Sequence, residues 1–63
     1  MNTFAVTMVN GRTSFIQADS IKDVFGIIDG LRLQEKRWLK TFDFESEMMH
    51  DVFINIDHIV SIE

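Results

Sequence analysis

The dipeptide Asn10-Gly11 constrains this chain most, because it stands between two segments that alternate as β-strands do. Residues 3–9 read TFAVTMV and residues 12–18 read RTSFIQA. Asn-Gly is typical of a two-residue type I′ turn, in which both central residues adopt a positive φ. The pattern therefore predicts a β-hairpin over residues 3–18.

A two-residue turn also fixes the register, and the register decides which side chains share a face. With the turn at Asn10-Gly11, Val6 stands opposite Phe15 and Phe4 stands opposite Gln17. Directly opposed residues project from the same face of a sheet. The face that we expect to be buried then carries Phe4, Val6, Met8 and Phe15.

A helical pattern follows the hairpin. Ser20, with Asp23 three residues later, resembles a capping box. The apolar residues that follow at helical spacing are Ile21, Val24, Phe25, Ile27, Ile28 and Leu31. We expect a helix that ends between Gly30 and Gln34 and packs this stripe on the apolar face of the hairpin.

The second half of the chain alternates again. Residues 37–44 predict a strand with Trp38, Lys40, Phe42 and Phe44 on one side and Leu39, Thr41 and Asp43 on the other. Residues 45–51 are polar at both ends and predict a hairpin connection, followed by a strand over 52–56. Asp57-His58 then interrupts the pattern before a short last strand over 59–62.

These elements predict a single α+β domain over residues 1–63, because a core does not divide at this length. The expected order is β-β-α-β-β-β, with one helix packed across one face of a small antiparallel sheet of four or five strands. A small curled barrel is the alternative, with Asp57-His58 as a single-turn break between the last two strands.

The apolar content is high for a chain of 63 residues, at 46%. A domain of this size buries only about 60% of the surface of its unfolded chain. The sequence contains no cysteine, so disulfides do not supplement the core. We therefore expect self-association, as a homodimer or a higher oligomer. We also expect this acidic protein to be cytoplasmic.

The sequence offers no recognised motif for catalysis, a cofactor or a metal. Its two histidines form the pairs His50-Asp51 and Asp57-His58, but neighbours on a strand point to opposite faces. We interpret them as turn residues and expect neither an enzyme nor a bound cofactor or metal.

The expected function is that of a small interaction or accessory regulatory protein that binds another protein. The candidate contact residues are Trp38, Met48 and Met49. Exposed methionines suit adaptable contacts, although one of them could instead cover the sheet edge. Trp38 could likewise pack in the core.

The alternative function is nucleic-acid binding through the basic segment 32–40. Its cations are Arg32, Lys36, Arg37 and Lys40, which with Glu35 give a net charge of +3. The following residues, 41–63, carry −6 and the whole chain carries −4. Because this balance opposes phosphate binding, we do not expect nucleic acid as the partner. The longest uninterrupted apolar runs are two or three residues, so we expect no membrane either. The acidic residues of 43–63 either keep the protein soluble or present a negative surface to a basic partner.

Overall fold

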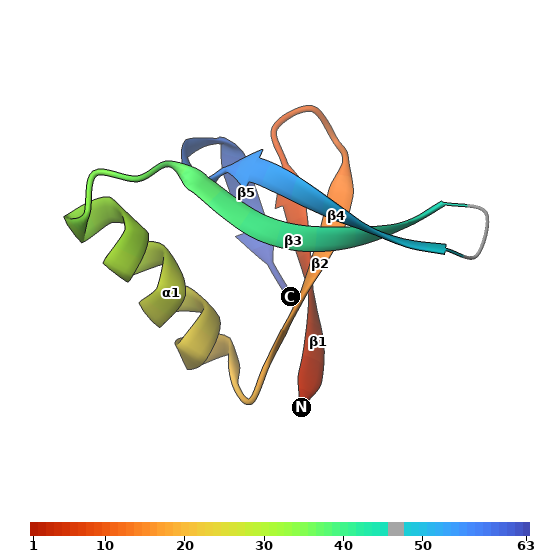
Figure 1. Cartoon of the computed structure of the whole chain (residues 1–63), viewed down its shortest axis with the longest axis horizontal. Coiled ribbons are helices and arrows are strands. Elements are labelled where there is room, and N and C mark those ends of the chain that lie inside the picture. The colour runs from red at the N-terminus through yellow and green to blue at the C-terminus, as the bar shows by residue number, and fades with distance from the viewer. Residues whose placement is uncertain (46–47) are drawn as a thin grey trace.

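The computed structural model describes residues 1–45 and 48–63 (Figure 1). Over these residues the elements are β1 (Asn2–Met8), β2 (Thr13–Ala18), α1 (Ile21–Leu33), β3 (Trp38–Glu45), β4 (Met48–Asn55), the 3-10 helix η1 (Ile56–His58) and β5 (Ile59–Ile62). The strands form one antiparallel sheet in the order β4-β3-β2-β1-β5, with α1 packed against it. The predicted α+β fold and order of elements are therefore confirmed.

The sheet curls, and its two edge strands β4 and β5 are joined in sequence by η1 (Figure 1). The Asn55 side chain accepts a hydrogen bond from the Asp57 N–H at 2.9 Å and so caps η1. The Ile56 N–H donates to the Arg37 carbonyl at 2.8 Å, which ties η1 to the start of β3. The predicted single-turn break at Asp57-His58 is present, but no ladder joins β4 to β5, so the sheet remains open.

The helix lies across the concave face of the sheet, beside β2 and β3. The Ser20 side chain accepts a hydrogen bond from the Asp23 N–H at 3.3 Å, as the capping pattern predicts. The buried apolar core consists of Val6, Ile16, Ala18, Val24, Ile28, Leu39, Ile54 and Ile56. The helix contributes only Val24 and Ile28 to it, whereas Phe25 and Ile27 remain about half exposed. The buried stripe is narrower than predicted because the small sheet covers only part of the helix.

The helix ends at Leu33, within the predicted range, and Gly30 lies inside it rather than at its end. The two residues after the cap close the last turn: the Glu35 N–H donates to the Arg32 carbonyl and the Lys36 N–H donates to the Leu31 carbonyl. This is a Schellman-type ending, and it places Glu35 at a φ of 59°.

The first hairpin forms where predicted, but its register is displaced by one residue. The Gly11 N–H donates to the Met8 carbonyl and the Met8 N–H donates to the Arg12 carbonyl, which makes a three-residue loop. Gly11 has a φ of 84°, whereas Asn10 has no positive φ, so the turn is not type I′. Phe15 therefore stands opposite Ala5 rather than Val6.

A displacement of one residue reverses the two faces of β2. Ser14, Ile16 and Ala18 now point into the core, and Phe15 points to the opposite face of the sheet. The predicted burial of Phe15 beside Val6 against the helix is therefore wrong.

The second hairpin is longer than predicted. The strands β3 and β4 pair from Trp38–Asn55 as far as Glu45–Met48, so 45 and 48–51 belong to strands rather than to a connection. Residues 46–47 and the Glu45 side chain lie outside the described part of the structure. The predicted alternation of 37–44 is confirmed, with Leu39 and Thr41 buried on the inner side.

Candidate functional site

The outer side of β3 and β4 gathers side chains that alternate with the core residues of the same strands. The pairs Trp38–Asn55, Lys40–Phe53, Phe42–Asp51 and Phe44–Met49 lie opposite one another. We call these eight residues the outer β3–β4 face. They share one side of the sheet because directly opposed residues do so and because alternate residues of a strand do so.

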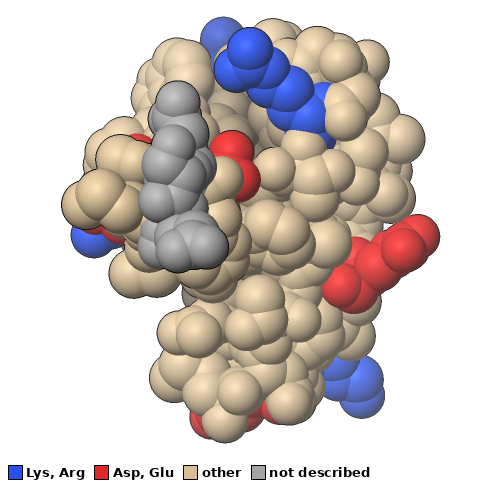
Figure 2. Space-filling model, turned by 90° about the vertical axis from the view of Figure 1, so that its right-hand side faces the viewer, with Lys and Arg blue, Asp and Glu red and all other residues tan. Residues whose placement is uncertain are grey.

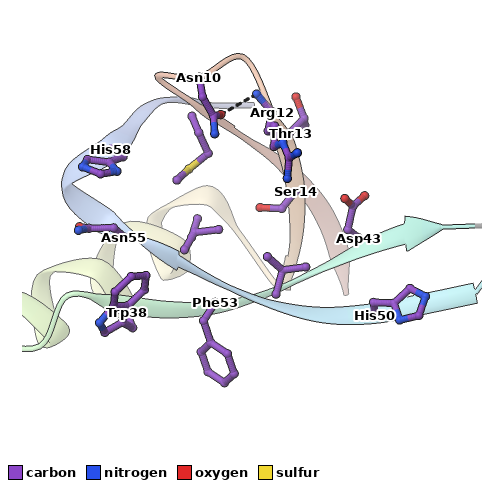
Figure 3. Close-up of a pocket in the computed structure, with 13 residues that line it drawn as sticks. Asn10, Arg12, Thr13, Ser14, Trp38, Asp43, His50, Phe53, Asn55 and His58 are labelled. Carbon is purple, nitrogen blue, oxygen red and sulfur yellow. Dashed lines mark hydrogen bonds between the residues drawn. The ribbon is translucent and has the colours of Figure 1, made fainter.

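This face is strongly apolar and exposed. The exposed fractions of its large apolar residues are 61% for Trp38, 59% for Phe44, 63% for Met49 and 61% for Phe53. Figure 3 shows the Phe53 ring projecting away from the rest of the strand framework. Figure 2, which views the molecule from the end toward which β3 and β4 extend, shows acidic and basic side chains scattered among uncharged residues.

An aromatic cluster joins this face to β2. The Phe15 ring lies 5.9 Å from the Phe42 ring and 6.1 Å from the Phe44 ring, measured between centroids, and the last two rings are 5.7 Å apart and nearly perpendicular. These distances are those of favourable aromatic pairs. The displaced register of the first hairpin is what brings Phe15 to this side, so the aromatic surface continues onto β2.

The charged residues of the outer face are Lys40 and Asp51. The Lys40 Nζ lies 3.5 Å from an Asp51 carboxylate oxygen, and both side chains are more than half exposed. An exposed pair of this kind contributes about 0–1 kcal/mol to stability. The two charges cancel, so the outer face is apolar and electrically neutral within an acidic protein.

The three residues proposed from sequence as partner contacts do not lie on one surface. Trp38 and Met49 belong to the outer β3–β4 face, and the interpretation of Trp38 as a core residue is wrong. Met48 is exposed but is displaced from that face by strand alternation. Sequence reasoning missed Phe44 and Phe53 as exposed residues, although the alternation of residues 37–44 had already grouped Phe44 with Trp38.

The cations of the basic segment are spread over several elements. Lys40 lies on the outer face beside Asp51, whereas Arg32, Lys36 and Arg37 line a hollow that also includes Glu35 and Asp57. The Arg37 Nε lies 4.0 Å from an Asp57 carboxylate oxygen. The segment therefore mixes both signs of charge rather than forming a continuous basic patch.

The two histidines line opposite ends of one cavity on the other side of the sheet (Figure 3). Among the described residues, no group of three or more His, Cys, Asp or Glu side chains is arranged to hold a metal ion. Within the same residues, no helix has the length and apolar character needed to cross a bilayer.

Comparison with known proteins gives no relative: the chain matches no protein-family model, no curated protein and no solved structure.

Proposed function

We propose that this chain is a small non-enzymatic interaction protein that binds protein through the outer β3–β4 face, with a second copy of itself as the first partner. The observation that carries the proposal is the exposure of Trp38, Phe44, Met49 and Phe53 on one side of one hairpin. Tryptophan, other aromatic residues and methionine are enriched at the centres of protein interfaces.

The apolar area of this face supports an interface of ordinary size. Each of the four exposed side chains presents roughly 120 Å², so together they present about 500 Å². A specific interface buries about 800 Å² per partner. The remaining residues of the face, with Phe15 beside them, form a rim that supplies the rest of this area.

The total surface of the chain also favours a covered state. The accessible surface is 4698 Å², whereas a monomer of this mass is expected to expose about 4,200 Å². The molecule measures 36 × 26 × 17 Å, and the β3–β4 hairpin extends away from the helix (Figure 1). The excess surface is comparable to the apolar area on the outer face of that hairpin.

The charges favour a second copy over a charged partner. A two-fold interface brings one patch against itself, so its charges must be self-complementary. The outer face has one charge of each sign, and two copies can exchange Lys40–Asp51 pairs across a two-fold axis. Association of two copies through other parts of the surface meets electrostatic repulsion, because each chain carries a net charge of −4. In addition, β4 is an edge strand, whose free backbone groups favour pairing with another strand.

The test compares Phe53→Glu with Leu33→Glu in sedimentation equilibrium. Both changes add one negative charge at an exposed apolar residue, but Leu33 is 87% exposed at the end of α1, away from the outer face. We expect the wild-type chain to have a mass above 7.4 kDa at micromolar concentration. Phe53→Glu should weaken association by at least about tenfold, because an interface centre does not accept an unpaired charge.

Leu33→Glu should associate like the wild-type chain, and circular dichroism should show that both variants are folded. A wild-type chain that remains monomeric at high concentration contradicts self-association. Equal weakening by the two changes contradicts the choice of the outer face.

The basic segment supports a second candidate, single-stranded nucleic-acid binding. Lys36, Arg37 and the exposed Trp38 line one shallow hollow, and cations beside an aromatic ring suit phosphate contact with base stacking. Glu35 lines the same hollow and Asp57 lies beside Arg37, so we rank this candidate second.

A further inference from the structure

A cavity of about 420 Å³ opens on the inner side of the sheet (Figure 3). It lies between the β1–β2 loop, β4 and η1, and Trp38 and Phe53 of the outer face contribute to one part of its lining. Met8, Val52 and Ile54 form an apolar part of its lining, and polar side chains stand around them. This volume and this mixture of groups are typical of small-molecule sites.

Ser14 is the first reason to assign a ligand to this cavity. It is 5% exposed, its hydroxyl points toward the cavity in Figure 3, and its Oγ is buried with no hydrogen-bond partner among the described residues. The other buried hydroxyl, that of Thr41, donates to the Val52 carbonyl at 2.9 Å. Buried polar groups are nearly always paired, so an unpaired hydroxyl aimed at a cavity indicates a missing partner.

The second reason is the pair of opposite charges that flank Ser14. Arg12 extends from the β1–β2 loop and Asp43 from β3, and both line the cavity (Figure 3). Neither forms an ion pair within the described residues. The Asn10 side chain accepts a hydrogen bond from the Arg12 N–H at 2.9 Å, and the Asp43 carboxylate accepts one from the Phe44 N–H at 2.8 Å. The first bond holds the backbone at Arg12 and leaves its side chain free to move, whereas the second bond holds the Asp43 carboxylate.

We propose that this cavity binds a small zwitterion with an apolar side chain, that is, an apolar α-amino acid. The ligand carboxylate pairs with the Arg12 guanidinium, and the ligand ammonium pairs with the Asp43 carboxylate. The Ser14 hydroxyl donates to a carboxylate oxygen between them. The apolar side chain of the ligand rests on Met8, Val52 and Ile54. Because Arg12 is long and exposed, it can move aside to let the ligand oxygen reach Ser14.

The charge balance of the lining distinguishes this ligand class from others. A simple carboxylate meets Arg12 but is repelled by Asp43, and a simple amine meets Asp43 but is repelled by Arg12. Only a ligand with both charges satisfies both residues. His50 and His58, at the two ends of the cavity, are additional hydrogen-bonding groups in this arrangement.

The test uses three probes of the same shape: leucine, 4-methylpentanoate, which lacks the ammonium group, and 3-methylbutylamine, which lacks the carboxylate. Amide chemical shifts of the ¹⁵N-labelled full chain report binding. We expect saturable shifts with leucine below about 50 mM, centred on Ser14 and the β1–β2 loop. Each single-charge probe should bind at least about fivefold more weakly.

Variants test the assigned contacts. Arg12→Gln should weaken leucine binding by about tenfold, and Arg32→Gln, which lies outside the cavity, should leave it unchanged. Asp43→Asn should weaken leucine binding but strengthen binding of 4-methylpentanoate, because it removes the repulsion. Ser14→Ala should also weaken leucine binding while the amide spectrum shows a folded chain.

Absence of saturable shifts with leucine overturns the proposal. Equal binding of the three probes, or a normal affinity in Arg12→Gln, overturns it as well. Self-association is separated from these outcomes by Met49→Glu, which alters an outer-face residue that does not line the cavity and should bind leucine like the wild-type chain.

Discussion

Gly11 holds the β1–β2 loop in a conformation that residues with a side chain rarely adopt. Its φ is 84°, and a Cβ built at this position meets no atom within 4 Å. The cost of a larger residue therefore comes from the backbone conformation alone and not from a collision with neighbouring atoms. The same loop fixes the register of β1 and β2, so this one residue influences both faces of the sheet.

We expect Gly11→Val to lower the free energy of unfolding by at least about 1 kcal/mol, because valine at positive φ is strained. Gly26→Ala is the matched control: a Cβ also meets nothing there, but the residue lies inside α1. That change should raise the free energy of unfolding by about 0.5–1 kcal/mol. Urea denaturation measures both, and unchanged stability in Gly11→Val contradicts the strained loop.

At the scale of elements, the sequence predicts which segments form strands and the helix better than it predicts their faces. Asn10-Gly11 is compatible with a two-residue turn and with a three-residue loop that has glycine in the left-handed region. The two choices differ by one residue of register, and that difference exchanges Phe15 for Ile16 as the buried residue. Hydrophobic burial alone favours the two-residue turn, which is the wrong choice, because that register buries Phe15 and Phe15 is larger than Ile16.

The strand β3 presents the same difficulty. Its alternation is plain in the sequence, but the side with Trp38 and Phe44 is more apolar than the side with Leu39 and Thr41. If the chain is assumed to be isolated, burial of the more apolar side is expected, and the strand is then predicted with the wrong side facing the core. The aromatic side of β3 faces outward. A partner surface that covers these aromatic residues accounts for this orientation.

The cavity could not be predicted from the sequence at all. Ser14 and Asp43 lie on different strands, and Arg12 lies in a loop. No spacing along the chain brings the three together. Their proximity depends on the hairpin register, which turns Ser14 inward, and on the curl of the sheet, which brings the β1–β2 loop over β4.

At the scale of the whole molecule, charge separates the two candidate functions. The chain carries −4, and both Arg37 and Lys40 have an acidic neighbour within 4.0 Å. These acids offset much of the attraction that phosphates exert on the cations. The outer β3–β4 face, in contrast, requires no net charge on its partner.

We expect no binding of single- or double-stranded oligonucleotides tighter than about 100 μM at physiological salt, the weak end of non-specific affinity. Fluorescence anisotropy with labelled oligonucleotides measures this. Micromolar binding that weakens steeply with salt, and that charge reversal at Arg37 and Lys40 abolishes, favours the nucleic-acid candidate instead.

Trp38 reports directly on whether association covers the outer β3–β4 face. It is the single tryptophan of the chain and is 61% exposed in the isolated chain. Its emission spectrum and its quenching by acrylamide are measured while the full chain is diluted from a concentration at which it associates. We predict blue-shifted, protected emission at high concentration and red-shifted, readily quenched emission after dilution. Emission that stays red-shifted and readily quenched at every concentration contradicts burial of the outer β3–β4 face by association.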